Sequence, residues 1–133
     1  MRIVIMGCGR TGSLLATKLD RAGHEVAVLD WSNEAFSRLP DDFGGETVSG
    51  NAVDQDILRQ AGIDHADAFI AATSGDNRNI VASEIAQQVF GVPKVISRIK
   101  DPNRAKIYSE LGIQVDCRTT EGGQALLKLL RLA

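Results

Sequence analysis

The residues with the most chemical content form a glycine-rich loop near the start of the chain. The loop reads G-x-G-x-x-G, follows an apolar run at residues 3–6, and precedes an amphipathic helix expected over residues 11–22. Gly7 permits a tight turn, Gly9 leaves room for a pyrophosphate, and Gly12 lets the helix pack closely on the strand. Free N–H groups at a helix start attract phosphate. We therefore predict that phosphate binds this loop, which comprises Gly7, Cys8, Gly9, Arg10, Thr11 and Gly12. A tight strand-to-helix turn without a ligand is the alternative.

An acidic residue, Asp30, follows the loop at the position where a nucleoside-binding loop of this kind needs a carboxylate. Asp30 ends a second expected strand over residues 25–30, and it can accept hydrogen bonds from both hydroxyls of an adenosine ribose. It would repel a 2′-phosphate, so NAD is favoured over NADP. Trp31 comes directly after it and belongs to the predicted site. The alternative is that Asp30 caps a short helix expected just after Ser32.

Further polar residues follow the other expected strands. They are Asn51 and Ala52 after the third strand, Thr73 and Ser74 after the fourth, and Arg98 near the end of the fifth. Ligands of open parallel sheets bind outside the carboxyl ends of the strands. We therefore expect the first pair near an adenine and the other three near a distal phosphate or a second nucleotide. A purely local loop role is the alternative for Asn51 and Thr73, and an ion pair with Asp101 or Asp116 is the alternative for Arg98.

These residues need a scaffold in which strands and helices alternate. Apolar runs predict strands at residues 3–6, 25–30, 46–49, 68–72, 94–99 and 114–117. Helices are expected over residues 11–22, 33–39, 54–61, 76–90, 101–111 and 119–132, the last capped by Thr119 or Thr120. This alternation predicts an α/β, doubly wound Rossmann fold as one domain over residues 1–133. Its six-stranded parallel sheet should have the order 3-2-1-4-5-6, with helices on both faces.

Length, charge and composition exclude several classes of protein. A chain of 133 residues suits one domain and leaves no space for a separate substrate domain. A net charge of −2 provides no field for nucleic acid, and no apolar run approaches the ~18 residues of a membrane span. The two cysteines lack metal-ligand spacing, and no nucleophile–base arrangement occurs. We therefore expect no metal site, no catalytic residues and no direct membrane insertion.

The motifs taken together resemble one known family. Residues 7–12, 23–30, 50–52, 71–77, 79–80 and 97–113 follow one another as in the TrkA-N domain, also called the RCK or KTN domain. The resemblance implies a cytoplasmic sensor that binds NAD or NADH, or alternatively ATP, ADP or AMP. It also implies a homodimer or higher ring, held at the inner face of the plasma membrane by a partner. That partner would be an integral-membrane potassium transporter or channel, gated by conformational change.

Carried over to this chain, the family pattern assigns pyrophosphate to the glycine loop, ribose to Asp30, and adenine to Asn51 and Ala52. Thr73, Ser74 and Arg98 would lie at the distal phosphates or the nicotinamide. Asn51 departs from the family pattern, which more often has Asp in a Gly-Asp-Ala-Thr stretch. That departure weakens the adenine assignment.

The expected last helix suggests an assembly. Its leucines surround most of its circumference, and a helix that is apolar on all sides is usually buried on more than one side. The resemblance implies that residues 119–132 form an intersubunit crossover helix, and a helix that simply covers the sheet is the alternative. Family members usually carry a second, smaller domain after this helix, which this sequence does not include. Two other functions remain open: the cofactor-binding domain of an NAD-dependent dehydrogenase, and a sugar-nucleotide or CoA-binding module.

Overall fold

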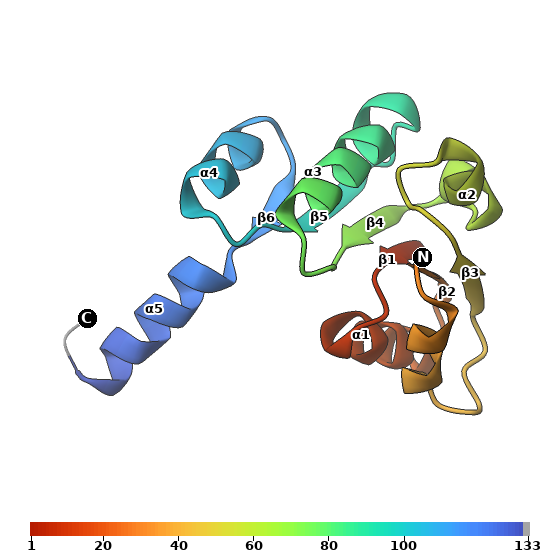
Figure 1. Cartoon of the computed structure of the whole chain (residues 1–133), viewed down its shortest axis with the longest axis horizontal. Coiled ribbons are helices and arrows are strands. Elements are labelled where there is room, and N and C mark those ends of the chain that lie inside the picture. Colours follow the sequence, from red (N-terminus) through yellow and green to blue (C-terminus); the bar gives the residue numbers. More distant parts are fainter. Residues whose placement is uncertain (132–133) are drawn as a thin grey trace.

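The computed structural model describes residues 1–131 and contains a six-stranded sheet in which every pairing is parallel. Its strands are β1 (Arg2–Met6), β2 (Glu25–Asp30), β3 (Glu46–Ser49), β4 (Ala68–Ala71), β5 (Lys94–Arg98) and β6 (Gln114–Asp116). They pair in the order β3-β2-β1-β4-β5-β6, which confirms the predicted doubly wound topology (Figure 1). The strands after β1 are added first on one side of it (β2, β3) and then on the other (β4, β5, β6). A ligand-binding crevice is therefore expected at the carboxyl ends of β1 and β4, where the order reverses.

Helices connect successive strands, as the sequence pattern predicts. They are α1 (Arg10–Arg21), α2 (Gln55–Gln60), α3 (Asp76–Glu84), α4 (Pro102–Glu110) and α5 (Arg118–Leu129). Two details differ from expectation. The segment after β2 is a 3₁₀ helix, Asn33–Arg38, and the second part of the helix expected over residues 76–90 is π-helical, Ile85–Val89. A further short 3₁₀ helix covers Ile63–His65.

The sheet is buried on both faces because side chains alternate along each strand. In β1, Ile3 and Ile5 pack on the face covered by α1, whereas Val4 and Met6 pack on the face covered by α2 and α3 (Figure 1). All four side chains are buried, which explains why β1 reads as a continuous apolar run rather than as alternating apolar and polar residues.

Local signals define several helix ends, and one predicted signal is wrong. Asp101 caps α4 by accepting a hydrogen bond from the backbone N–H of Asn103 (3.1 Å). The last helix instead begins at Arg118, with Cys117 in the cap position and no side-chain cap bond. Thr119 and Thr120, the expected caps, therefore lie inside the helix, because the chain passes from β6 into α5 with only one residue between them.

Helix α5 extends away from the body of the molecule (Figure 1). None of its residues is buried, and Leu129 and Leu130 are 80% and 67% exposed. The alternative of a helix that covers the sheet is therefore wrong, while the intersubunit role remains a prediction. Leu132, the end of the predicted helix, lies outside the described residues. Within residues 1–131, no helix is both long enough and apolar enough to span a bilayer.

Candidate functional site

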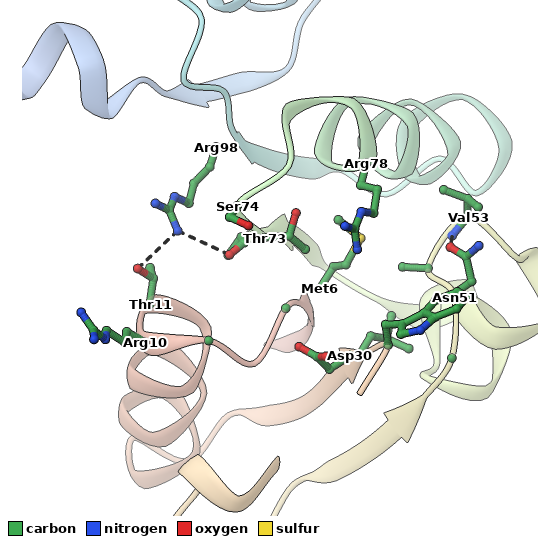
Figure 2. A pocket seen from close by; sticks show the side chains of 17 residues that line it. Met6, Arg10, Thr11, Asp30, Asn51, Val53, Thr73, Ser74, Arg78 and Arg98 are labelled. Carbon is green, nitrogen blue, oxygen red and sulfur yellow. Dashed lines mark hydrogen bonds between the residues drawn. The ribbon is translucent and has the colours of Figure 1, made fainter. Parts of the chain in front are cut away.

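A cavity of about 470 Å³ opens at the carboxyl ends of the central strands (Figure 2). It is lined by Met6, Gly7, Gly9, Arg10, Thr11, Leu29, Asp30, Trp31, Gly50, Asn51, Ala52, Val53, Ala72, Thr73, Ser74, Arg78 and Arg98. This set contains every predicted site residue except Cys8 and Gly12. The cavity lies where the sheet order reverses, as a doubly wound fold requires of its ligand site.

The three glycines of the loop differ in what surrounds them. Gly7 has a φ of +107°, a conformation that glycine adopts without strain. A Cβ built on Gly12 would collide with the carbonyl of Gly7, so this residue lets α1 pack against the loop. A Cβ built on Gly9 would meet nothing within 4 Å and would enter open space. The backbone of Gly9 is therefore accessible from the cavity, which is the geometry that a phosphate needs.

Asp30 links the end of β2 to the glycine loop. Its Oδ2 accepts a hydrogen bond from the backbone N–H of Cys8 (2.8 Å), and its Oδ1 accepts one from the N–H of Ser32 (2.8 Å). Asp30 thus has a structural role before any ligand binds. Its bond to the N–H of Ser32 resembles the helix-capping role that was the alternative for this residue. Each carboxylate oxygen has a second lone pair, so the carboxylate can still accept hydrogen bonds from ribose hydroxyls.

Cys8 faces away from the cavity, although its position in the loop made it a predicted site residue. Its side chain is fully buried, in the core on the α1 face of the sheet. Burial and the negative charge of Asp30 raise the pKa of the Cys8 thiol, and the cation of Arg38 partly opposes this shift. Because its N–H is bonded to Asp30, Cys8 shapes the loop rather than the wall of the cavity.

Buried Asn79 organises the far side of the cavity, and sequence reasoning had given it no role. Its side-chain Oδ1 accepts hydrogen bonds from the N–H and the hydroxyl of Thr73 (3.1 and 2.6 Å). Its Nδ2 donates to the carbonyls of Thr73 (3.0 Å) and Arg98 (2.9 Å). One side chain therefore joins the ends of β4 and β5 to the start of α3. A polar residue on the buried side of an expected helix was the available signal.

Arg98 reaches across the cavity from β5 to α1 (Figure 2). Its Nη1 donates to Oγ1 of Thr11 (3.4 Å) and to the carbonyl of Ala72 (3.5 Å). The two acidic residues considered as ion-pair partners are engaged elsewhere. Asp101 caps α4, and Asp116 pairs with Arg118 (3.0 Å). The guanidinium of Arg98 therefore lies beside the glycine loop, as the predicted phosphate contact requires.

The wall formed after β3 is partly a turn. Oδ1 of Asn51 accepts a hydrogen bond from the N–H of Val53 (3.1 Å), so the side chain of Asn51 has the local loop role that was the alternative. Ala52 is buried beneath it. Sequence reasoning missed several lining residues, namely Met6, Leu29, Val53, Ala72 and Arg78. Most of them are apolar strand ends, which carry no chemical signal of their own.

The charge of the lining favours an anion. Three guanidinium groups, those of Arg10, Arg78 and Arg98, lie around a cavity whose single acidic side chain is Asp30. Guanidinium groups bind phosphate with charge-assisted hydrogen bonds. Within residues 1–131, no group of three or more His, Cys, Asp and Glu side chains is arranged to hold a metal ion. The lining is therefore suited to phosphate groups.

Asp76 supports the adjoining loops rather than the cavity. Its carboxylate accepts hydrogen bonds from the N–H groups of Lys100 (2.8 Å) and Asp101 (3.0 Å). Burial alone would raise the pKa of Asp76, but these two bonds, with the charges of Lys100 and Arg104, lower it below its ordinary value. The start of α3 is thereby tied to the start of α4.

Known proteins with similar sequences are potassium uptake proteins. A family model described as the TrkA-N domain matches residues 3–116. The Trk system potassium uptake protein TrkA of Streptomyces coelicolor is 55% identical over 113 residues, which are 85% of this chain and 51% of that protein. The chain thus spans about half the length of the curated relatives it matches.

Solved structures with the same fold include another TrkA-N domain and a channel. The TrkA-N domain of inner membrane protein ybaL from Escherichia coli has a TM-score of 0.85 and 25% identity, covering 97% of this chain and 96% of that chain. The GsuK channel has been solved bound to NAD (TM-score 0.80, 27% identity, 98% of this chain and 23% of that chain). It has also been solved bound to ADP (TM-score 0.80, 27% identity, 97% and 33%). Because the family model covers most of its length, this chain belongs to the TrkA-N domain family.

Proposed function

We propose that this protein is a nucleotide-sensing regulatory component of a potassium transport system. The observation that carries the proposal is the cavity at the sheet reversal, whose described lining combines a phosphate-type glycine loop, three arginines and a single acidic side chain, Asp30. Membership of the TrkA-N family connects such a cavity with potassium uptake. In this proposal, NAD(H) or an adenine nucleotide binds, and no substrate is converted.

The roles of the cavity residues follow from their positions. The open face of Gly9 and the start of α1 would receive the pyrophosphate, with Arg10 and Arg98 as charge partners. Asp30 would accept hydrogen bonds from the ribose, because its carboxylate lines the cavity beside the loop. Trp31, 68% exposed on the rim, would cover the adenosine.

The remaining predicted residues would have secondary roles. Ala52 would form part of the adenine wall, and the side chain of Asn51 would contribute mainly by shaping its turn. Thr73 and Ser74 would lie at the distal phosphates. Thr11 would share that end with Arg98, to which its hydroxyl is already bonded.

Both NAD and ADP are reasonable ligands. The GsuK channel, 27% identical to this chain, has been solved with each of them. The two share an adenosine diphosphate, which is the part that the glycine loop and Asp30 would hold. We infer that the chain binds this shared portion, while groups beyond it decide which nucleotide is preferred.

Binding without turnover is consistent with the ionisable groups of the cavity. Among the described lining residues, these are Asp30 and three arginines, and arginine is not a proton acceptor at neutral pH. Both oxygens of Asp30 already accept backbone hydrogen bonds. Such a lining offers no paired acid and base for proton transfer.

The output would be a change of assembly passed to a membrane potassium transporter or channel. A ligand shifts such an equilibrium only by binding one conformation more tightly than another. The fully exposed helix α5 is suited to contact a second copy of the chain, so we propose a homodimer or a higher ring. The protein would then lie in the cytoplasm, held at the inner face of the membrane by its partner.

Isothermal titration calorimetry of the purified chain with NAD, NADH, ADP and ATP tests the proposal. We expect binding, and a roughly tenfold or greater loss in Asp30→Asn, because a hydrogen bond to a charged group contributes about 1.5–3 kcal/mol. Asp20→Asn is a matched control: Asp20 also accepts a backbone hydrogen bond, from Gly44 (2.9 Å), but lies outside the cavity. Absence of nucleotide binding by the wild type, or equal losses in the two variants, would contradict the proposal.

A further inference from the structure

We propose that Arg78 is a ligand-binding residue whose guanidinium stacks on the base of the bound nucleotide. The inference rests on the proposed nucleotide-binding function and adds a contact that the sequence motifs do not contain. Arg78 lies in the first turns of α3, outside the glycine loop and outside the strand ends that the motifs mark.

The side chain of Arg78 is directed into the cavity. It is one of the lining residues, and Figure 2 shows it extending from α3 toward Met6. The guanidinium lies close to the β4–α3 loop, because a Cβ built on Gly75 would lie 3.7 Å from Nε of Arg78. The guanidinium therefore enters the cavity from above the loop that follows β4.

No protein group within residues 1–131 forms a hydrogen bond or an ion pair with the Arg78 side chain. The polar groups nearest to it in sequence have other partners. Asp76 accepts the N–H groups of Lys100 and Asp101, and Oδ1 of Asn77 accepts a hydrogen bond from Arg104 (2.6 Å). Asp30, the acidic residue of the cavity, is bonded to backbone N–H groups. The cation is thus available to a ligand.

The lining divides into a polar part and an apolar part, and Arg78 belongs with the latter. Arg98 lies at the glycine loop, bonded to Thr11 and to the carbonyl of Ala72. Arg78 extends instead toward Met6 (Figure 2), and the remaining apolar lining comes from Leu29, Ala52 and Val53. An apolar wall suits the flat face of a base better than a phosphate. A planar guanidinium opposite that wall completes a stacking site.

A series of ligands with a common base and different phosphates tests this inference. AMP, ADP and NAD are titrated by calorimetry into the wild type, Arg78→Ala, Arg78→Lys and the control Arg104→Ala, which removes an arginine outside the cavity. We expect Arg78→Ala to weaken binding of all three ligands by a similar factor, about 2- to 30-fold, the range for a cation over an aromatic face. Arg78→Lys should recover only part of this loss, since lysine lacks the plane.

Several outcomes would overturn the inference, and they are distinguishable from failure of the proposed function. A loss that grows from AMP to ADP, or full recovery by lysine, would identify Arg78 as a phosphate contact. Unchanged affinity in Arg78→Ala, with normal binding by the wild type, would overturn this inference alone. Absence of wild-type binding would overturn both. Urea unfolding midpoints equal to that of the wild type would show that the variants are folded, as expected for a side chain without protein partners.

Discussion

Replacing Asn79 by alanine should destabilise the protein more than its small change in size suggests. The side chain of Asn79 is 1% exposed and takes part in four hydrogen bonds, to the N–H, hydroxyl and carbonyl of Thr73 and to the carbonyl of Arg98. A buried intramolecular hydrogen bond contributes about 1 kcal/mol, and unpaired buried groups cost more. Water entering the vacated space would restore part of the loss. We therefore expect the free energy of unfolding to fall by about 2–4 kcal/mol.

Urea denaturation followed by circular dichroism measures this loss. Asn77→Ala is the matched control: it is the same residue type in the same helix, but exposed, with one bond to Arg104. It should change the free energy of unfolding by no more than about 0.5 kcal/mol. The slope with urea should be unchanged in both variants, so that the difference appears in the midpoint. Equal midpoints for Asn79→Ala and Asn77→Ala would refute the role assigned to Asn79.

Three further changes have clear expected outcomes. Gly12→Ala should lower the free energy of unfolding by about 3 kcal/mol or more, because the new Cβ would collide with the Gly7 carbonyl. Gly9→Ala should instead leave the urea midpoint nearly unchanged and weaken nucleotide binding measured by calorimetry. Because the pKa of Asp76 is lowered in the folded state, its ionised carboxylate stabilises the fold at pH values above its ordinary pKa of 3.8. This contribution is lost as the pH falls through the lower pKa of the folded state. Wild type and Asp76→Asn should therefore differ in urea midpoint at pH 7 but not near pH 2. Charged substitutions at Leu129 and Leu130 should give a monomer in sedimentation velocity at concentrations where the wild type associates.

The sheet could be predicted because its signals are local. The central strands β1, β2 and β4 are short, mainly apolar runs, each helix start follows at the expected distance, and glycines such as Gly23, with a φ of +90°, end helices where expected. The strand order then follows from the general rules for alternating strands and helices, without knowledge of any contact. The same logic places the cavity, because it depends on the sheet reversal alone.

The features that could not be predicted from the sequence depend on tertiary packing. The sequence gives no sign that Cys8 points into the core while its neighbour Gly9 faces the cavity, because the direction depends on how α1 docks. Arg78 was missed for a similar reason: an arginine on a helix could equally face solvent. The position of α5 is also not a local property. The pattern of its leucines predicts a helix. Whether that helix covers this sheet or extends from it depends on the surfaces available for it to pack against.

The two backbone bonds of Asp30 have a consequence for how a bound molecule can be sensed. They hold the glycine loop against β2, so the ribose end of the cleft has its final shape in advance. In the proposed function, such a preformed half would bind all nucleotides that share an adenosine equally well and would not distinguish between them. In the opposite half, Asn79 fixes the backbone at the ends of β4 and β5, but the Arg98 side chain has only long contacts, to Thr11 and Ala72 at 3.4 and 3.5 Å. In the proposed function, groups that differ between nucleotides would be contacted there, at the end of β5, whose neighbour β6 leads directly into the projecting α5.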